Sequence, residues 1–139
     1  MTAGPPDSVQ ILYEIFTLDG GVLTARIGTR AWCPIAPSDW RNEDPAIVYS
    51  FLAPVLDVSH RSERGEVSVR CYGGTTQFKD ANRLMRLLGK QVHDQSFDVA
   101  AGGIAWIWQA SNNPSLRDPD TGWPYAQSTW LYQAVARPD

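Results

Sequence analysis

Residues 102–137 read GGIAWIWQASNNPSLRDPDTGWPYAQSTWLYQAVAR and hold four of the six tryptophans of the chain. Residues 104–109 are β-formers that follow two glycines, a polar run over residues 111–122 interrupts them, and β-formers return over residues 123–136. Aromatic and β-branched residues on both sides of a turn-rich segment predict two strands joined by a loop. Because the second strand is longer than most strands, we expect it to extend beyond its own sheet.

Both faces of this predicted hairpin are substantially apolar. In the last strand Tyr125 and Leu131 alternate with Trp130 and Tyr132, so apolar side chains point to both sides. Aromatic residues on strands usually belong to a core or to cross-strand pairs. One layer of helices covers one face of a sheet, however, so we expect the other face to contact another chain. The predicted interface residues are Trp106, Trp108, Trp123, Tyr125, Trp130, Tyr132, His60, Arg61 and Arg64.

The rest of the chain supplies helices and further strands. We expect a helix over residues 8–18, a helical turn over 22–27, strands over 46–52 and 66–72, and an amphipathic helix over 77–93. Prolines make residues 28–45 an irregular crossover, residues 57–64 read as a charged hairpin tip, and residues 96–101 read as a link. These elements predict an α+β fold with a mainly antiparallel four-stranded sheet and helices packed on one face. Their predicted order is helix, strand, strand, helix, strand, strand.

Length and composition favour a single domain over residues 1–139, with residues 1–6 as a flexible N-terminus. The chain is 43% hydrophobic and 19% charged, and its net charge is −3. Its charges are interspersed, so no basic patch indicates tight binding to nucleic acid or to an anionic membrane. Without the pattern of a secretory signal or of a membrane span, the sequence predicts a protein that folds in a cytoplasm.

No set of residues has the spacing of a catalytic or metal site. His60 lies in the charged tip and His93 at a helix end, where solvated roles are more common than catalysis. Cys33 and Cys71 are interpreted as reduced, buried thiols, since no cluster of cations that would activate them is evident. We therefore predict no catalytic residue and no cofactor.

Two turn-rich segments imitate ligand-binding motifs. Residues 118–122, Asp-Pro-Asp-Thr-Gly, resemble the start of a calcium loop, but Ser128 stands where the bidentate glutamate would be. Residues 73–76, Gly-Gly-Thr-Thr, precede a helix and could cradle a phosphate, yet the Walker lysine is missing. An ordinary turn and a helix capped by Thr75 or Thr76 are the preferred interpretations.

The order of the elements and the last strand resemble a known family. A short N-terminal helix, a proline-rich crossover, the strand at residues 67–72, a helix containing Asp-Ala-Asn-Arg-Leu at residues 80–84 and the closing residues 118–125, Asp-Pro-Asp-Thr-Gly-Trp-Pro-Tyr, carry the resemblance. The chain is similar in these respects to the tail terminator, or tail completion, proteins of long-tailed bacteriophages and gene transfer agents. The likeness extends over nearly the whole sequence.

The resemblance implies a non-enzymatic structural protein of the virion. It implies a homo-oligomer, a six-membered ring at the head-proximal end of the tail, that is assembled in the host cytoplasm. Its implied partners are the tail tube protein and a head–tail connector or stopper protein, while genome DNA passes through the ring without specific binding. The family has no known catalytic residues, so none is assigned, and no membrane or cofactor is implied.

Other interpretations remain open at the level of the sequence. Another neck component, such as a head–tail stopper or adaptor, differs little from a terminator in sequence pattern. A carbohydrate- or nucleotide-binding module would use the aromatic residues of the hairpin as a stacking platform. A small enzyme that uses His60 or His93 is a more remote alternative.

Overall fold

We describe the protein from a computed structural model that covers residues 5–57 and 61–136. His60 and residues 1–4 of the expected flexible N-terminus lie outside these described residues, whereas Pro6 is buried. The elements, in chain order, are α1 (Ser8–Phe16), α2 (Thr24–Ile27), β1 (Ala31–Trp32), β2 (Ala46–Leu56), β3 (Ser62–Tyr72), α3 (Phe78–Val92), β4 (Gln95–Val99), β5 (Gly102–Arg117) and β6 (Pro124–Ala136).

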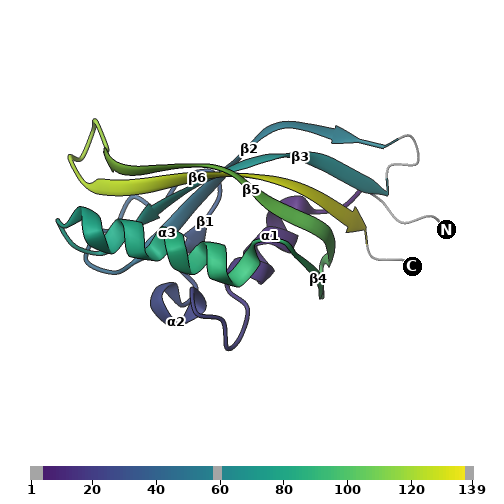
Figure 1. The fold of residues 1–139 in the computed structure, drawn as a ribbon, viewed down its shortest axis with the longest axis horizontal. Coiled ribbons are helices and arrows are strands. Elements are labelled where there is room, and N and C mark those ends of the chain that lie inside the picture. Colours follow the sequence, from purple (N-terminus) through teal and green to yellow (C-terminus); the bar gives the residue numbers. More distant parts are fainter. Residues whose placement is uncertain (1–4, 58–60, 137–139) are drawn as a thin grey trace.

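The strands form one curved, six-stranded sheet in the order β1-β2-β3-β6-β5-β4. β1 runs parallel to β2, and each other neighbouring pair is antiparallel. Figure 1 shows the helices lying against one face of the sheet, with α3 running beneath its central strands. We call this helix-covered side the inner face and the opposite side the outer face.

The prediction of a four-stranded, mainly antiparallel sheet is wrong, because β1 and β4 add two strands and the parallel pairing of β1 makes the sheet mixed. β1 has two residues within the proline-rich crossover and pairs Ala31 with Ile47, so it is too short to show a period. β4 replaces most of the predicted link, and only Phe97 and Val99 of its five residues are partly shielded. The predicted element order is wrong for the same reason.

The long hairpin also differs from its prediction. β5 continues through the polar run to Arg117, because bulges between Gln109 and Ser111 and between Asn113 and Leu116 absorb residues that do not fit the ladder. β6 lies between β3 and β5 and pairs with both along most of its length. The strand expected to extend beyond its sheet is therefore a central strand, and its length is used inside the subunit.

The inner face carries the hydrophobic core. Even-numbered residues of β6 point toward α3, so Trp130 and Tyr132 have no exposed surface, and Val67 lies opposite Trp130 on β3. The helix expected over residues 77–93 is found at Phe78–Val92, and its apolar stripe packs on β3, β5 and β6. None of the helices in the described part of the chain is long and apolar enough to span a membrane.

One buried amide joins the three helices. The Gln91 side chain accepts the Leu23 N–H at 2.8 Å and donates to the carbonyl of Ile15 at 2.9 Å. The same amide also donates to the Phe16 carbonyl, so it satisfies groups at the end of α1 and the start of α2. A side chain that reads as polar surface in the sequence thus fixes the helical layer.

Residues of the α3 region cover the part of the β5 edge that β4 does not pair with. β4 pairs with β5 over residues 102–107. After residue 107, the edge of β5 that faces away from β6 has no strand partner within the described residues. There the His93 Nδ1 atom accepts the Gln109 N–H at 3.0 Å, and the Asn82 side chain accepts the Ser115 N–H at 3.3 Å. Pro114 removes a further donor, so this edge offers few groups to an incoming strand.

Candidate functional site

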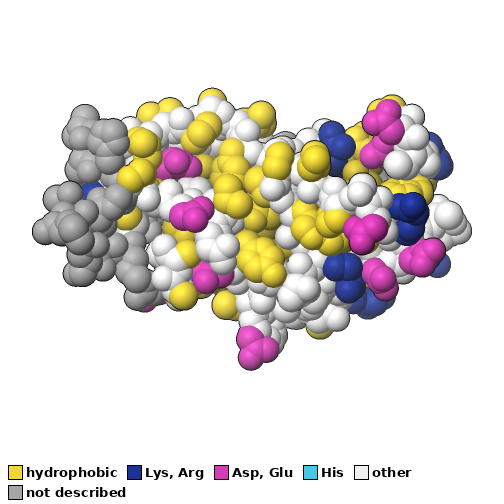
Figure 2. All heavy atoms as spheres, turned by 180° about the vertical axis from the view of Figure 1, so that it is seen from behind, with side chains coloured by type: hydrophobic (Ala, Val, Ile, Leu, Met, Phe, Trp, Pro, Cys, Tyr) yellow, Lys and Arg dark blue, Asp and Glu magenta, His cyan; other side chains and the backbone are white. Residues whose placement is uncertain are grey.

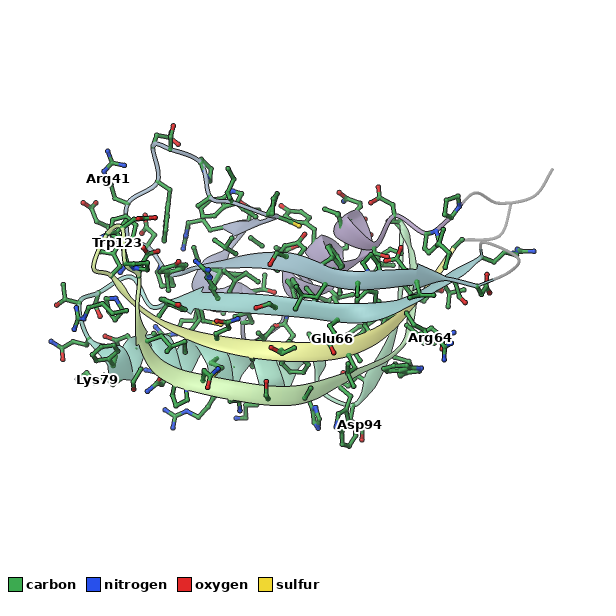
Figure 3. All side chains as sticks on the ribbon, turned by 90° about the horizontal axis from the view of Figure 1, so that it is seen from above. Arg41, Arg64, Glu66, Lys79, Asp94 and Trp123 are labelled. Carbon is green, nitrogen blue, oxygen red and sulfur yellow. The ribbon has the colours of Figure 1, made fainter. Side chains whose placement is uncertain are left out.

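The helices leave the outer face of the sheet uncovered. Figure 3 looks onto this face, with α3 behind the sheet. A row of small hydroxyl side chains crosses its middle, where Ser50 lies opposite Ser68, Ser68 opposite Thr129, and Thr129 opposite Ser111. This hydroxyl row separates two hollows, one toward each end of the strands.

The first hollow, which we call the strand groove, has a volume of about 450 Å³. Val55, Trp106 and Leu131 give it an apolar surface, and their exposed fractions are 60%, 40% and 36%. The remaining lining residues are Ala53, Arg64, Gly65 and Glu66. Exposed apolar side chains that share one groove are typical of an interaction surface.

Local backbone irregularities shape the strand groove. β2 bulges between Leu52 and Val55, and Ala53 adopts a positive φ of 47° there. On the other side, the Trp106 Nε1–H donates to the side-chain oxygen of Gln133 at 2.9 Å, which fixes the indole against β6. The groove is therefore formed by the folded subunit before any partner binds.

The second hollow, the tryptophan pocket, lies between the proline-rich loop (residues 33–45) and the turn that joins β5 to β6. Its volume is about 440 Å³. The Trp40 ring packs against the rings of Tyr72 and Trp123, with 5.3 Å between centroids in each pair. The Trp40 Nε1–H is buried and has no hydrogen-bond partner among the described residues.

The charged groups on the wall of the tryptophan pocket contact tyrosine side chains. The Tyr72 hydroxyl donates to Asp118 at 3.2 Å, and the Arg70 guanidinium lies 5.3 Å from the centre of the Tyr125 ring. Burial is the main cause that raises the pKa of Tyr72, and the Asp118 carboxylate adds to it while Arg70 opposes it. This wall combines aromatic surface with a small polar network.

The segment that imitates a calcium loop is a turn in the structure. The Asp118 carboxylate accepts the N–H groups of Asp120 at 2.8 Å and Thr121 at 3.2 Å. Partial burial works to raise the pKa of Asp118, but these hydrogen bonds outweigh it, so the pKa lies below its usual value. No group of three His, Cys, Asp or Glu side chains that could hold a metal ion occurs within residues 5–57 and 61–136.

Residues 73–76, which resemble a phosphate-binding motif, lead into α3, and no threonine caps this helix. Gln77 is the N-cap residue of α3 and makes no side-chain capping bond, so the predicted cap at Thr75 or Thr76 is wrong. Thr75 instead accepts the Gln77 N–H and donates to Asp80 at 2.6 Å. Gly73 lies so close to the backbone at Asp80 that a Cβ atom would collide with it.

The structure divides the predicted interface residues among three places. Trp106, Trp108, Arg61 and Arg64 are exposed, and Trp123 is half-buried in the tryptophan pocket. Three others are buried inside the subunit, and His60 lies outside the described residues; the buried ones are Tyr125, Trp130 and Tyr132. The hairpin tryptophans therefore do not form a single stacking platform.

The histidine and cysteines considered in the sequence have structural surroundings. The His93 ring lies 4.5 Å from the Trp108 ring, centroid to centroid, in addition to its hydrogen bond with β5. Cys71 is fully buried and Cys33 half-buried, and burial raises the pKa of both thiols. Raised pKa values disfavour the reactive thiolate.

Two parts of the outer surface were missed from the sequence. Ile35, in the proline-rich loop, is 77% exposed, the largest exposed fraction among the large apolar residues described. Val55 lies beyond the strand predicted over residues 46–52, because β2 continues through Pro54 to Leu56. The apolar run Leu-Ala-Pro-Val-Leu at residues 52–56 was the available signal, since a proline is tolerated at a bulge or a sheet edge.

The distribution of charge on the surface is uneven. In the view from behind, hydrophobic side chains gather across the middle of the molecule, and Lys and Arg side chains gather toward one end, interspersed with Asp and Glu (Figure 2). No extended surface of one sign is visible on this face. The charges visible on this face are therefore mixed in sign.

A comparison with solved structures finds the same fold in a chain of the virion of a native gene transfer agent particle. The match covers 91% of this chain and 93% of that chain, with a TM-score of 0.60 and 13% sequence identity. No protein-family model and no curated protein matches the sequence. At this identity the likeness establishes a shared fold along almost the whole of both chains.

Proposed function

We propose that this chain is a structural subunit of a phage-like or gene-transfer-agent-like virion, and that it acts as the tail terminator. The observation that carries the proposal is the fold match to a virion chain, which extends over nearly the full length of both proteins. The sequence resemblance to tail terminators supports the finer role. In this proposal the protein has no catalytic activity and works through its surfaces.

A terminator needs surfaces for three kinds of contact. Copies of the chain would form a ring. One side of the ring would bind the last layer of tail tube protein, and the other side would bind a connector or stopper protein. Tube growth stops because the second side does not repeat the surface of the tube. With a net charge of −3, the subunits would let DNA pass through the ring without specific binding.

Assembly with a cognate tail tube protein tests the proposal. Tubes polymerised alone should grow to heterogeneous lengths, and adding this protein should shorten them and place a ring at one end, visible by negative-stain electron microscopy. Tubes whose length and ends are unchanged at saturating protein would contradict the terminator role. If the protein instead binds the connector and leaves tubes uncapped, it is another neck component.

The tryptophan pocket favours a second candidate function, the binding of a small ligand. Its volume of about 440 Å³ and its aromatic wall of Trp40, Tyr72 and Trp123 are typical of ligand sites. Tryptophan fluorescence titrated with a panel of sugars and nucleotides checks this function. Saturable quenching that Trp40→Ala removes would support it, while unchanged fluorescence at millimolar ligand would exclude it.

A further inference from the structure

We propose that the subunits join head to tail, with Ile35 of one copy inserted into the strand groove of the next copy. This inference rests on the proposed ring and names the surfaces that would form it. It commits the groove to a second copy of this chain, and not to a different virion protein. The supporting observations are the shape, position and charge of the two surfaces.

The first observation is that the molecule carries an exposed apolar side chain, Ile35 on the lining of the tryptophan pocket, and an apolar hollow that does not include it. Ile35 is 77% exposed, and the strand groove of about 450 Å³ is lined by the exposed side chains of Val55, Trp106 and Leu131. A hollow of this size accommodates an aliphatic side chain together with part of its loop. Burial of both surfaces in one contact would remove apolar area from water on each side.

The second observation is the position of the two surfaces. In Figure 3, Arg41 of the proline-rich loop and Trp123 lie at one end of the molecule, while Arg64 of the strand groove lies toward the other end. A contact between different patches at opposite ends is heterologous, and its repetition closes a ring when the rotation per subunit permits. A contact between two identical patches would stop at a dimer.

The third observation is the charge and stiffness of the surfaces. Arg64 and Glu66 line the groove, and Asp39 and Arg41 are exposed near Ile35, so each surface offers a cation and an anion. Prolines at positions 34 and 37 flank Ile35 and fix their own φ angles. A loop with less freedom loses less entropy on docking, which favours association.

Strand pairing at the sheet edges explains assembly less well. Pro54 and the bulge at Ala53 interrupt the exposed edge of β2, and α3 side chains occupy donors on the edge of β5. Natural proteins use these same devices to prevent edge pairing. The outer face therefore offers a better docking surface than the described edges of β2 and β5.

Two charge substitutions test the contact from its two sides. Ile35→Asp changes the inserted side chain, and Val55→Asp changes the strand groove. Each substitution should weaken ring formation roughly 30-fold or more, as expected for a hot-spot contact. Val22→Asp is the matched control, because Val22 is 45% exposed outside both surfaces. Sedimentation velocity over a concentration series gives the assembly state, and thermal unfolding verifies that each variant is folded.

Mixing the two variants distinguishes head-to-tail contacts from other arrangements. Each variant alone should be monomeric, but the mixture should form discrete heterodimers. The intact Ile35 of the Val55→Asp variant can insert into the intact strand groove of the Ile35→Asp variant. A mixture that stays monomeric would overturn the inference. Variants that form rings as the parent does would also overturn the inference, but they would not contradict the proposed function.

Tube assays separate the remaining outcomes. If Val55→Asp still forms rings but no longer caps tubes, the groove binds the tube protein and the inference is wrong. If the parent protein forms no ring at any concentration, alone or with tube protein, both the inference and the proposed terminator ring fail.

Discussion

The two faces of the sheet are built from the same strands but obey different constraints. On β6, Trp130 points inward and has no exposed surface, while the next residue, Leu131, points outward and is 36% exposed. On β3, Val67 faces Trp130 inside the core, and Glu66 faces Leu131 outside. Neighbouring residues of one strand thus belong to two different environments.

This contrast indicates which substitutions should affect folding and which should affect contacts with other molecules. The inner face is filled by apolar side chains whose burial stabilises the subunit, so changes there should act on folding. The outer face combines a hydroxyl row with two partly apolar hollows, so changes there should act on contacts with other molecules. Four substitutions test how strict this division is.

The largest effect is expected for Trp130→Ala on the inner face. Removal of a fully buried indole leaves a cavity, and the free energy of unfolding should fall by about 3–5 kcal/mol. Urea denaturation followed by circular dichroism measures it. Trp106→Ala is the outer-face control and should cost about 1 kcal/mol or less, so equal losses in the two variants would break the division between the faces.

Gln91→Leu should have the next largest effect. The substitution removes the partners of the Leu23 N–H and the Ile15 carbonyl, and unsatisfied buried groups of this kind should lower the free energy of unfolding by roughly 2–4 kcal/mol. The exposed Gln95 provides the matched control, Gln95→Leu, which should change stability by less than about 0.5 kcal/mol. If the two variants unfold alike, the amide does not hold the helical layer.

Val55→Ser on the outer face should change stability little. Val55 is 60% exposed, so we expect a change of less than about 0.5 kcal/mol in the free energy of unfolding. Binding of a hydrophobic dye to the native protein should fall, because the strand groove loses apolar surface. A large loss of stability with unchanged dye binding would assign Val55 to the core.

The smallest effect concerns pH and Asp118. The folded-state pKa of Asp118 lies below the usual pKa of an aspartate, so its contribution to stability is present above that usual pKa and is lost as pH falls through the folded-state pKa. Asp118→Asn should therefore make unfolding less dependent on pH below about 4. Thermal unfolding at a series of acidic pH values measures this, and identical pH profiles for parent and variant would contradict it.

Long periodic elements could be predicted from the sequence, because their burial pattern repeats. The stripe of α3 and the alternation along the second half of β3 each predict one buried face. The stripe is confirmed, whereas in β3 Ser68 and Tyr72 of the face expected to be wetter are buried too. β1 and β4 could not be predicted in this way. With two and five residues they are too short for a period, and their pairing depends on β2 and β5, which lie elsewhere in the sequence.

The candidate site was predictable only in part. The surplus of aromatic residues in the hairpin pointed to Trp106 and Trp108, which are exposed, and their place in an interface stays a prediction. The strand groove also needs the bulge at Ala53, which is a property of strand pairing and leaves no periodic signal. Gln91 was missed because its role depends on backbone groups of α1 and α2.

The cover that α3 gives to the β5 edge has a consequence for aggregation of the free protein. Since His93 and Asn82 both come from the α3 region, docking of the helix and protection of the strand edge occur together. A subunit whose helix has come loose presents unpaired amides, which can recruit the strands of other molecules. We therefore expect the protein to stay free of aggregation only while α3 is in place.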